Sequence, residues 1–203
     1  MTFVAFLIAA LTLAITPGPG IAYVVARTVA GGRAEGLASC LGTGIGGLIH
    51  VFAAAFGLSM IIAQSALAFS LLKYIGAAYL IYIGIRILTS KYEPQNIDSI
   101  QARGSRRALL DGILVEALNV KTAIFFLAFL PQFIDSGQSI AFQFVLLGSI
   151  CVLMNTLADV VAVFVAQRIL RSDTLRKARA KRLNHASGFT MIGLGVFLAF
   201  SKR

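Results

Sequence analysis

Three polar side chains occur together in a stretch that is otherwise apolar. Glu116, Asn119 and Lys121 lie in "ILVEALNVKTAIFF". A carboxylate in such surroundings can exchange a proton or bind an ammonium group, and a lysine can bind a carboxylate. Because Asp111 and Arg107 are close in sequence, a structural ion pair, or side chains reaching toward the end of a span, are the alternatives. Asn119 is the most interior candidate.

A further acid stands alone in a later apolar run. Asn155 and Asp159 are four residues apart, which places them on one face of a helix. Asp159 is the one Asp, Glu, Lys or Arg between residues 136 and 167. It is a candidate for a proton-linked carboxylate, and an acid hydrogen-bonded to a neighbouring helix is an equally good interpretation.

Small residues and one histidine recur at intervals of four in another apolar run. Gly42, Gly46 and His50 would form one stripe along a helix. Small residues at this spacing let helices pack closely, and we expect that role for the glycines. His50 is a candidate polar residue within the membrane, but a lone histidine does not indicate a metal. The sequence has no His/Cys cluster, phosphate loop or nucleophile motif, so we expect no metal, no cofactor and no enzymatic activity.

Two prolines and two glycines interrupt the first apolar run. Pro17, Gly18, Pro19 and Gly20 occur about 17 residues into it. Proline lacks an N–H group and clashes with the carbonyl four residues earlier, so it breaks a helix. Backbone groups freed at membrane depth must be buried in protein or line a wet cavity, and broken helices of this kind bind substrates in transporters. A structural kink or the end of a span is the alternative.

The composition identifies a membrane protein. Of 203 residues, 58% are hydrophobic and 13% charged, and the mean hydropathy is +0.87. Soluble domains carry about 25% charged residues, and a helix needs roughly 20 apolar residues to cross a bilayer. The net charge of +10 collects in short segments without aromatic residues between them, which indicates loops at anionic lipid rather than a nucleic-acid surface. Cys40 and Cys151 are expected to be small core residues.

The apolar runs predict an all-α protein with six transmembrane helices. The expected spans are about 3–29, 37–63, 67–88, 109–133, 140–167 and 186–200. Four basic residues lie in 89–107 and seven in 168–182, so the positive-inside rule places these loops in the cytoplasm and both termini outside.

The two halves of the chain favour an internal repeat. Sliding them by 103 positions places Asn119 on Thr16, and in both halves an apolar helix then enters a polar or helix-breaking patch. Because each half would hold three spans, the copies would be inverted in the membrane. We expect a single transmembrane domain, residues 1–203, with halves of about 1–88 and 108–201 and a basic cytoplasmic linker, 89–107.

Several segments, in order, resemble the landmarks of the LysE/RhtB family of amino-acid exporters. They are "TPGPG", "RTVAGGRAEGL", "GLIHVFAAAFGLS", "LLKYIGAAYLIYIGIRIL" and "ALNVKTAIFFLAFLPQFID". By position, Pro17, Gly18 and Pro19 match the family's first broken helix, and Asn119 and Lys121 match its second. The resemblance implies an inverted 3+3 bundle, export of amino acids or close derivatives from the cytoplasm, and coupling to the proton motive force.

Three positions depart from the family pattern. Gly20 stands where a polar Asn or Asp is common, which leaves only backbone there for binding. Val120 replaces a proline, so a softer second break is expected. Gly47 stands where many members carry Asp.

These observations together predict an exporter of the bacterial inner membrane that works by alternating access. The expected substrate-binding residues are Pro17 to Gly20, Asn119 and Lys121, and Glu116, Asp159, Asn155 and His50 are the candidates for proton coupling or intramembrane polar contacts. Membrane lipid and a small amino acid are the expected partners, and a homo-oligomer is possible. Export of a metal ion or another small metabolite, and a non-transporting membrane scaffold, are the alternatives.

Overall fold

The computed structural model describes residues 3–58, 66–89, 101–135, 137–169, 185, 188–189 and 191–200. All regular structure in these residues is helical, which agrees with the predicted all-α class. Most of the basic segment 168–182 and part of the linker 89–107 lie outside the described residues, so their placement stays a prediction.

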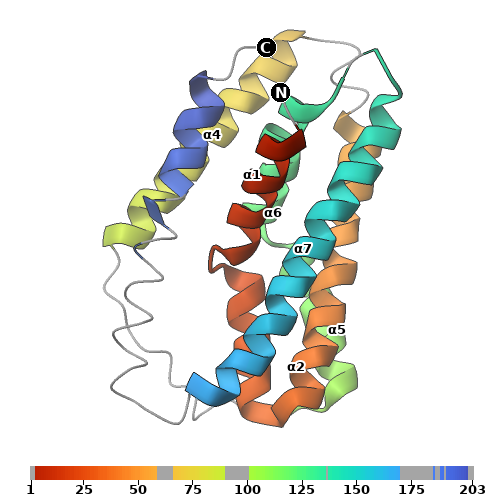
Figure 1. Cartoon of the computed structure of the whole chain (residues 1–203), viewed down its shortest axis with the longest axis vertical. Coiled ribbons are helices and arrows are strands. Elements are labelled where there is room, and N and C mark those ends of the chain that lie inside the picture. Colours follow the sequence, from red (N-terminus) through yellow and green to blue (C-terminus); the bar gives the residue numbers. More distant parts are fainter. Residues whose placement is uncertain are drawn as a thin grey trace.

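The first helices are separated by the Pro-Gly-Pro sequence. α1 (Phe3–Ile15) ends one residue before Thr16, and α2 (Pro19–Ala53) begins with Pro19. Proline is well tolerated at the first position of a helix, where its missing N–H group would have no partner. The prolines therefore break the run into two helices that share one path, as Figure 1 shows.

α2 itself consists of two arms. Gly32 interrupts it with φ 75° and ψ −170°, a backbone conformation that glycine adopts without strain. Figure 1 shows one arm of α2 descending from α1 and the other returning upward, and the second arm continues into a short π-helical turn, η1 (Ala54–Leu58). The expected boundary between the first two spans, between residues 29 and 37, therefore contains a reversal of the chain.

The second half begins with another broken helix. α5 (Ser105–Ala117) is followed by α6 (Val120–Ile124), η3 (Phe125–Phe129) and η4 (Leu130–Phe133), and the two parts are bent by 44°. No proline is needed here, because the Oδ1 of Asn119 accepts a hydrogen bond from the backbone N–H of Lys121 and caps α6. The replacement of proline by Val120 therefore leaves a clear break, set by the side chain before it.

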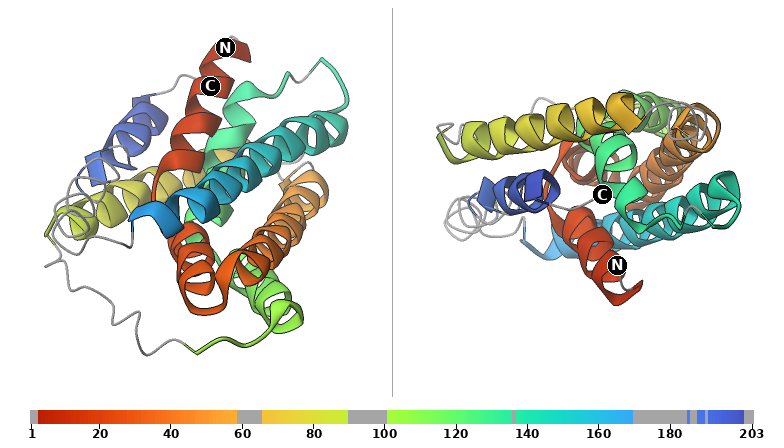
Figure 2. Two further views of the ribbon diagram at one scale, coloured as in Figure 1. Left: turned by 60° about the horizontal axis from the view of Figure 1, so that its bottom comes forward. Right: turned by 90° about the horizontal axis from the view of Figure 1, so that it is seen from above.

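The remaining helices complete the bundle. α4 (Ala66–Thr89), α7 (Ile140–Ile169) and the short helix Met191–Phe200 follow the expected third, fifth and last apolar runs closely. Figure 2 shows α7 crossing beside both arms of α2, with α5 on the opposite side of α2. Among the described residues, Pro19–Gly57 and Ile140–Ala166 are long and apolar enough to span a membrane, and the bent pair of α5 and Val120–Phe133 can make a third span.

Glycines allow α2 and α5 to approach closely. A Cβ added at Gly46 would lie 2.6 Å from the carbonyl oxygen of Ile113, and one at Gly42 would collide with the carbonyl of Leu109. The predicted packing role of Gly42 and Gly46 is thus confirmed. Large apolar side chains face outward on other surfaces, for example Leu153, Leu157 and Val161 along α7, which suits contact with lipid.

Candidate functional site

The two helix breaks lie side by side in the interior of the bundle. The Lys121 side chain extends from the second break to the first, where its Nζ donates hydrogen bonds to the carbonyl oxygens of Thr16 (2.9 Å) and Leu13 (3.2 Å). The end of α1 leaves the carbonyl of Thr16 without a helical partner, and the carbonyl of Leu13 has only a long backbone hydrogen bond, 3.3 Å from the N–H of Thr16. A lysine of the second break therefore supplies hydrogen-bond donors to backbone carbonyls of the first break.

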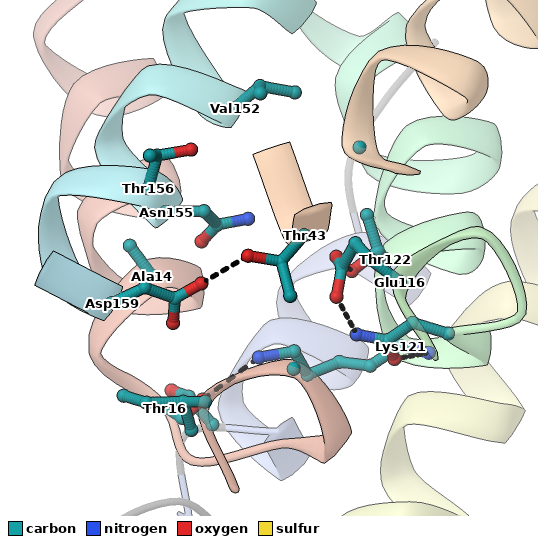
Figure 3. A pocket seen from close by; sticks show the side chains of 14 residues that line it. Ala14, Thr16, Thr43, Glu116, Lys121, Thr122, Val152, Asn155, Thr156 and Asp159 are labelled. Carbon is teal, nitrogen blue, oxygen red and sulfur yellow. Dashed lines mark hydrogen bonds between the residues drawn. The ribbon is translucent and has the colours of Figure 1, made fainter. Parts of the chain in front are cut away.

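A small cavity lies between the breaks and α7. About 30 Å³ of it can hold the centres of water molecules, which is room for roughly two waters. Figure 3 shows the side chains around this central cavity. The lining residues are Ala14, Thr16, Gly20, Ile21, Thr43, Gly47, Glu116, Asn119, Lys121, Thr122, Val152, Asn155, Thr156 and Asp159.

Glu116 is held by hydrogen bonds rather than by an ion pair. Its Oε1 accepts from the hydroxyl of Thr122 at 2.6 Å, and its Oε2 accepts from the amide nitrogen of Asn119 at 2.9 Å. The arginines near it in sequence pair with Asp111 instead. Glu116 is thus a buried acid with a fixed orientation at the cavity wall, 6% exposed.

Gly20 makes room for that carboxylate. A Cβ at this position would lie 2.6 Å from Oε2 of Glu116. The sequence predicts only that Gly20 offers backbone for binding, and the structure adds a steric role for this glycine. The missing side chain at residue 20 permits the Glu116 side chain to approach the start of α2. The N–H groups of Gly20 and Ile21 have no intrahelical acceptor, because the first such bond of α2 is made by Ala22, and both residues line the cavity.

Asp159 approaches from the opposite wall. It is 7% exposed, and its Oδ2 accepts a hydrogen bond from the hydroxyl of Thr43 at 2.8 Å. Asn155 lines the cavity one turn away, as the spacing of four residues predicts. Within the described part of the chain, no ion pair of 4.0 Å or less joins Lys121 to Asp159 or Glu116. With all three ionised, the cavity holds one cation and two anions.

His50 lies outside the lining of this cavity. Its Nε2 is 2.9 Å from the backbone carbonyl oxygen of Glu116, and its ring stacks on Phe126 with centroids 6.2 Å apart. A carbonyl accepts only from a protonated nitrogen, so Nε2 carries the hydrogen in this arrangement. The histidine contacts the backbone of the second break.

Pro17, Gly18 and Pro19 face a second, larger cavity of about 490 Å³ on the other side of the Lys121 side chain. Lys121 and Asn119 line both cavities. Gly18 packs against the lysine, since a Cβ there would lie 3.0 Å from Nζ. The expected binding residues are therefore divided between two spaces that share one wall.

Several residues of the two cavities are absent from the sequence-based prediction. Thr43 and Thr122 hold the two acids, and Tyr79 and Arg86 of α4 line the second cavity. Threonine is common in membrane helices, and Thr122 lies six residues from Glu116, across the helix break, so no helical spacing in the sequence indicated this contact. Among the described residues, no group of three or more His, Cys, Asp or Glu could hold a metal ion.

Another polar cluster joins the two halves at the end where the predicted cytoplasmic loops lie. Oε1 of Glu35 accepts from the backbone N–H groups of Arg103 (2.8 Å) and Gly104 (2.6 Å). Arg27 lies 3.7 Å from Oε2 of the same carboxylate, and both side chains are buried. This basic-end cluster ties the turn within α2 to the segment before α5.

The fold and its interior define a helical membrane protein with a polar cavity where two broken helices meet. Comparison of the sequence with family models gives the class a name: residues 11–202 match the LysE type translocator model. The chain belongs to this family of membrane transporters, and it is not an enzyme.

Relatives of this chain match over nearly their full lengths. A "homoserine/homoserine lactone efflux protein" of Salmonella typhimurium is 31% identical over 98% of this chain and 96% of its own. An uncharacterized membrane protein of Vibrio cholerae is 31% identical over 98% of this chain and 97% of its own. One from Synechocystis is 30% identical, with 95% and 93% covered. No solved structure gives a significant match.

Proposed function

We propose that this chain exports small amino acids or their close derivatives from the cytoplasm across the bacterial inner membrane. Homoserine and its lactone are the first candidates, because the Salmonella relative carries both in its name. The observation that carries the proposal is the meeting of the two helix breaks in a cavity with one lysine and two acids. Such a set of charges complements a zwitterion.

The polar groups suggest how a zwitterion is bound. Glu116 and Asp159 attract the ammonium group, while Lys121 attracts the carboxylate. The unpaired N–H groups of Gly20 and Ile21, at the positive end of α2, add donors for that carboxylate. Asn119 supports the site by orienting Glu116.

The size of the central cavity supports alternating access. A space for roughly two waters is too small for an amino acid, so the surrounding helices must separate when a substrate enters. Lys121 would have to leave the carbonyls of Leu13 and Thr16, and the breaks provide backbone that can move.

The helix bounds support a bundle of six spans in two inverted halves. α1 and α5 both contain 13 residues, and their first and last residues are separated by the same 102 positions. Figure 1 shows α1 descending toward its break and α5 rising toward its own. The gathering of Arg27, Arg103 and Arg107 at one end supports a cytoplasmic location for that end, with both termini outside.

We propose that Asp159 carries the coupled proton. It is buried, it accepts one hydrogen bond from a threonine, and its charge lies opposite the lysine that the substrate must displace. Protonation would release the ammonium group that the carboxylate attracts.

Transport by the purified protein in liposomes tests both parts of the proposal. We expect the wild-type protein to exchange radiolabelled L-homoserine and to accumulate it when a pH gradient is imposed. Asp159→Asn resembles the protonated acid, so it should weaken homoserine exchange and lose the gradient-driven accumulation, whereas Asp111→Asn, an acid outside both cavities, should behave as the wild type. Accumulation by Asp159→Asn at the wild-type level would contradict the coupling role. Absence of any amino-acid exchange by the wild type would contradict export.

A further inference from the structure

The second cavity is large enough for a small molecule. Its volume of about 490 Å³ lies within the range of about 300–1,000 Å³ that is usual for ligand pockets. The walls come from the Pro17–Pro19 break, from the second break, from Tyr79 and Arg86 of α4, and from Met191. None of the described residues that line the central cavity lies on α4, so this helix contributes to the second cavity alone.

The charges of the two cavities differ in sign. The ionisable groups that line the second cavity include Arg86 and Lys121, and among the described residues that line it there is no Asp or Glu. The central cavity instead has two acids against the same lysine. A guanidinium group binds a carboxylate through two parallel hydrogen bonds, a geometry that lysine does not reproduce.

Lys121 forms the wall between the cavities. Its side chain crosses the first break, with its ammonium group on the carbonyls of Leu13 and Thr16 and with Gly18 packed against it. A carboxylate in the second cavity would offer this ammonium group a charged acceptor in place of two neutral ones. The bonds to the carbonyls are already charge-assisted by the ammonium group, but a carboxylate adds an attraction between opposite charges that a neutral carbonyl lacks, so the exchange is favourable.

We infer that the second cavity is an entry site for the substrate carboxylate, in which Arg86 binds the carboxylate before Lys121 turns from the backbone carbonyls to receive it. The ligand class is a small α-amino acid with a free carboxylate. This inference rests on the proposed export function and adds a separate binding step. Arg86 lies near the end of α4, close in sequence to the expected cytoplasmic linker, which fits entry from the cytoplasm.

The test compares two compounds that differ at the carboxylate. L-homoserine has a free carboxylate, and in L-homoserine lactone that group is a neutral ring ester. We expect Arg86→Gln to raise the KM of L-homoserine transport at least about tenfold, the usual result of losing a charged hydrogen-bond partner. The KM of the lactone should stay within about twofold, because uncharged esters do not need the guanidinium group.

Two further variants separate charge from geometry. Arg86→Lys should recover part of the homoserine affinity, because it keeps the charge but not the paired donors. Arg106→Gln removes the same charge from an exposed site on α5 outside both cavities, and it should change neither KM. An equal loss for both compounds in Arg86→Gln, or no loss for either, would overturn the inference while export stands.

A binding measurement keeps the inference testable if transport fails. Thermal stabilisation of the purified protein by a panel of amino acids and by their carboxamides reports carboxylate recognition directly. Stabilisation by the acids alone that is lost in Arg86→Gln supports the entry site, even if the wild type transports neither homoserine compound. Equal stabilisation of wild type and Arg86→Gln, or none in either, overturns it.

Discussion

The two helix breaks meet at one site, yet they are built from different chemistry. The first, at residues 16–18, is made by proline and glycine, and its one polar side chain, Thr16, donates its hydroxyl back to the carbonyl of Thr12 in α1. The second, around Leu118 and Asn119, contains no proline and is made by a capping side chain. The first break therefore provides backbone acceptors, and the second provides the acid, the amide and the lysine that use them.

This difference shows how a weakly similar repeat can form one site. A backbone carbonyl carries no net charge and cannot neutralise a substrate's charge. A buried lysine ammonium group can do so, but it needs several hydrogen-bond acceptors once it has left water. Each break supplies what the other lacks, and Lys121 joins them. A substitution should thus have a larger effect when it removes a group shared by both breaks than when it alters one of them.

Lys121→Met should have the largest effect of the substitutions at the two breaks. It removes the ammonium donor from the carbonyls of Leu13 and Thr16 and leaves two acids without a nearby cation, so we expect homoserine exchange to fall about a hundredfold or more. Lys121→Arg keeps the charge and should fall less. Size-exclusion elution identifies variants that fail to fold, and a well-folded Lys121→Met protein with wild-type exchange would contradict the joining role.

Alanine substitutions at Gly20 and Gly18 compare the first break with the side chains it meets. At Gly20 the new Cβ would lie 2.6 Å from Oε2 of Glu116, which two hydrogen bonds hold in place. At Gly18 it would lie 3.0 Å from Nζ of Lys121, the end of a flexible chain. We expect about a tenfold loss of exchange for Gly20→Ala and a smaller loss for Gly18→Ala. The reverse order would show that Glu116 does not need this space.

Asn119→Ala tests the second break through its cap. The free energy of unfolding should fall by about 1 kcal/mol, the usual cost of removing such a cap, and Glu116 loses one donor. Thermal unfolding of the purified protein measures the change. Asn119→Asp retains the capping oxygen but places a negative charge beside Glu116, so it should keep the helix start and still impair exchange. Equal stability of Asn119→Ala and the wild type would show that the break does not depend on this side chain.

Val120→Pro should have the smallest effect. Val120 is the first residue of α6, where proline is tolerated, and Asn119 before it has φ −75° and ψ 101°, a conformation compatible with a following proline. We expect a change in the free energy of unfolding within about 0.5 kcal/mol, because proline also restricts the unfolded chain. Val115→Pro, in the interior of α5, is the control that should destabilise the protein strongly. Strong destabilisation by Val120→Pro would mean that the second break has a different backbone from the one described.

The sequence was informative where a residue type is costly in a membrane helix. Prolines, acids and a lysine are costly within apolar runs and are rare there unless they break a helix or face the bundle interior. Both breaks and the residues Glu116, Lys121 and Asp159 could therefore be found without a structure. The helix bounds also followed the apolar runs closely, because span length is fixed by the bilayer.

Other features depend on which helices become neighbours. Thr43 and Thr122 resemble any threonine in a membrane helix until they are found beside the two acids. Arg86 resembles a basic residue at the end of a span until α4 is placed against the first break. From the sequence, Gly20 was predicted only to lack a polar contact. The structure shows that the absence of a side chain at Gly20 makes room for the carboxylate of Glu116.

Competition for L-homoserine binding tests the central claim most directly. Radiolabelled L-homoserine is bound to the purified full-length protein and displaced either by unlabelled L-homoserine or by 4-hydroxybutyrate, which is the same molecule without the amino group. If Glu116 and Asp159 bind the ammonium group, 4-hydroxybutyrate should compete at least about tenfold more weakly. Equal competition by the two compounds, or no binding of L-homoserine, would contradict a site built by two helix breaks to hold a zwitterion.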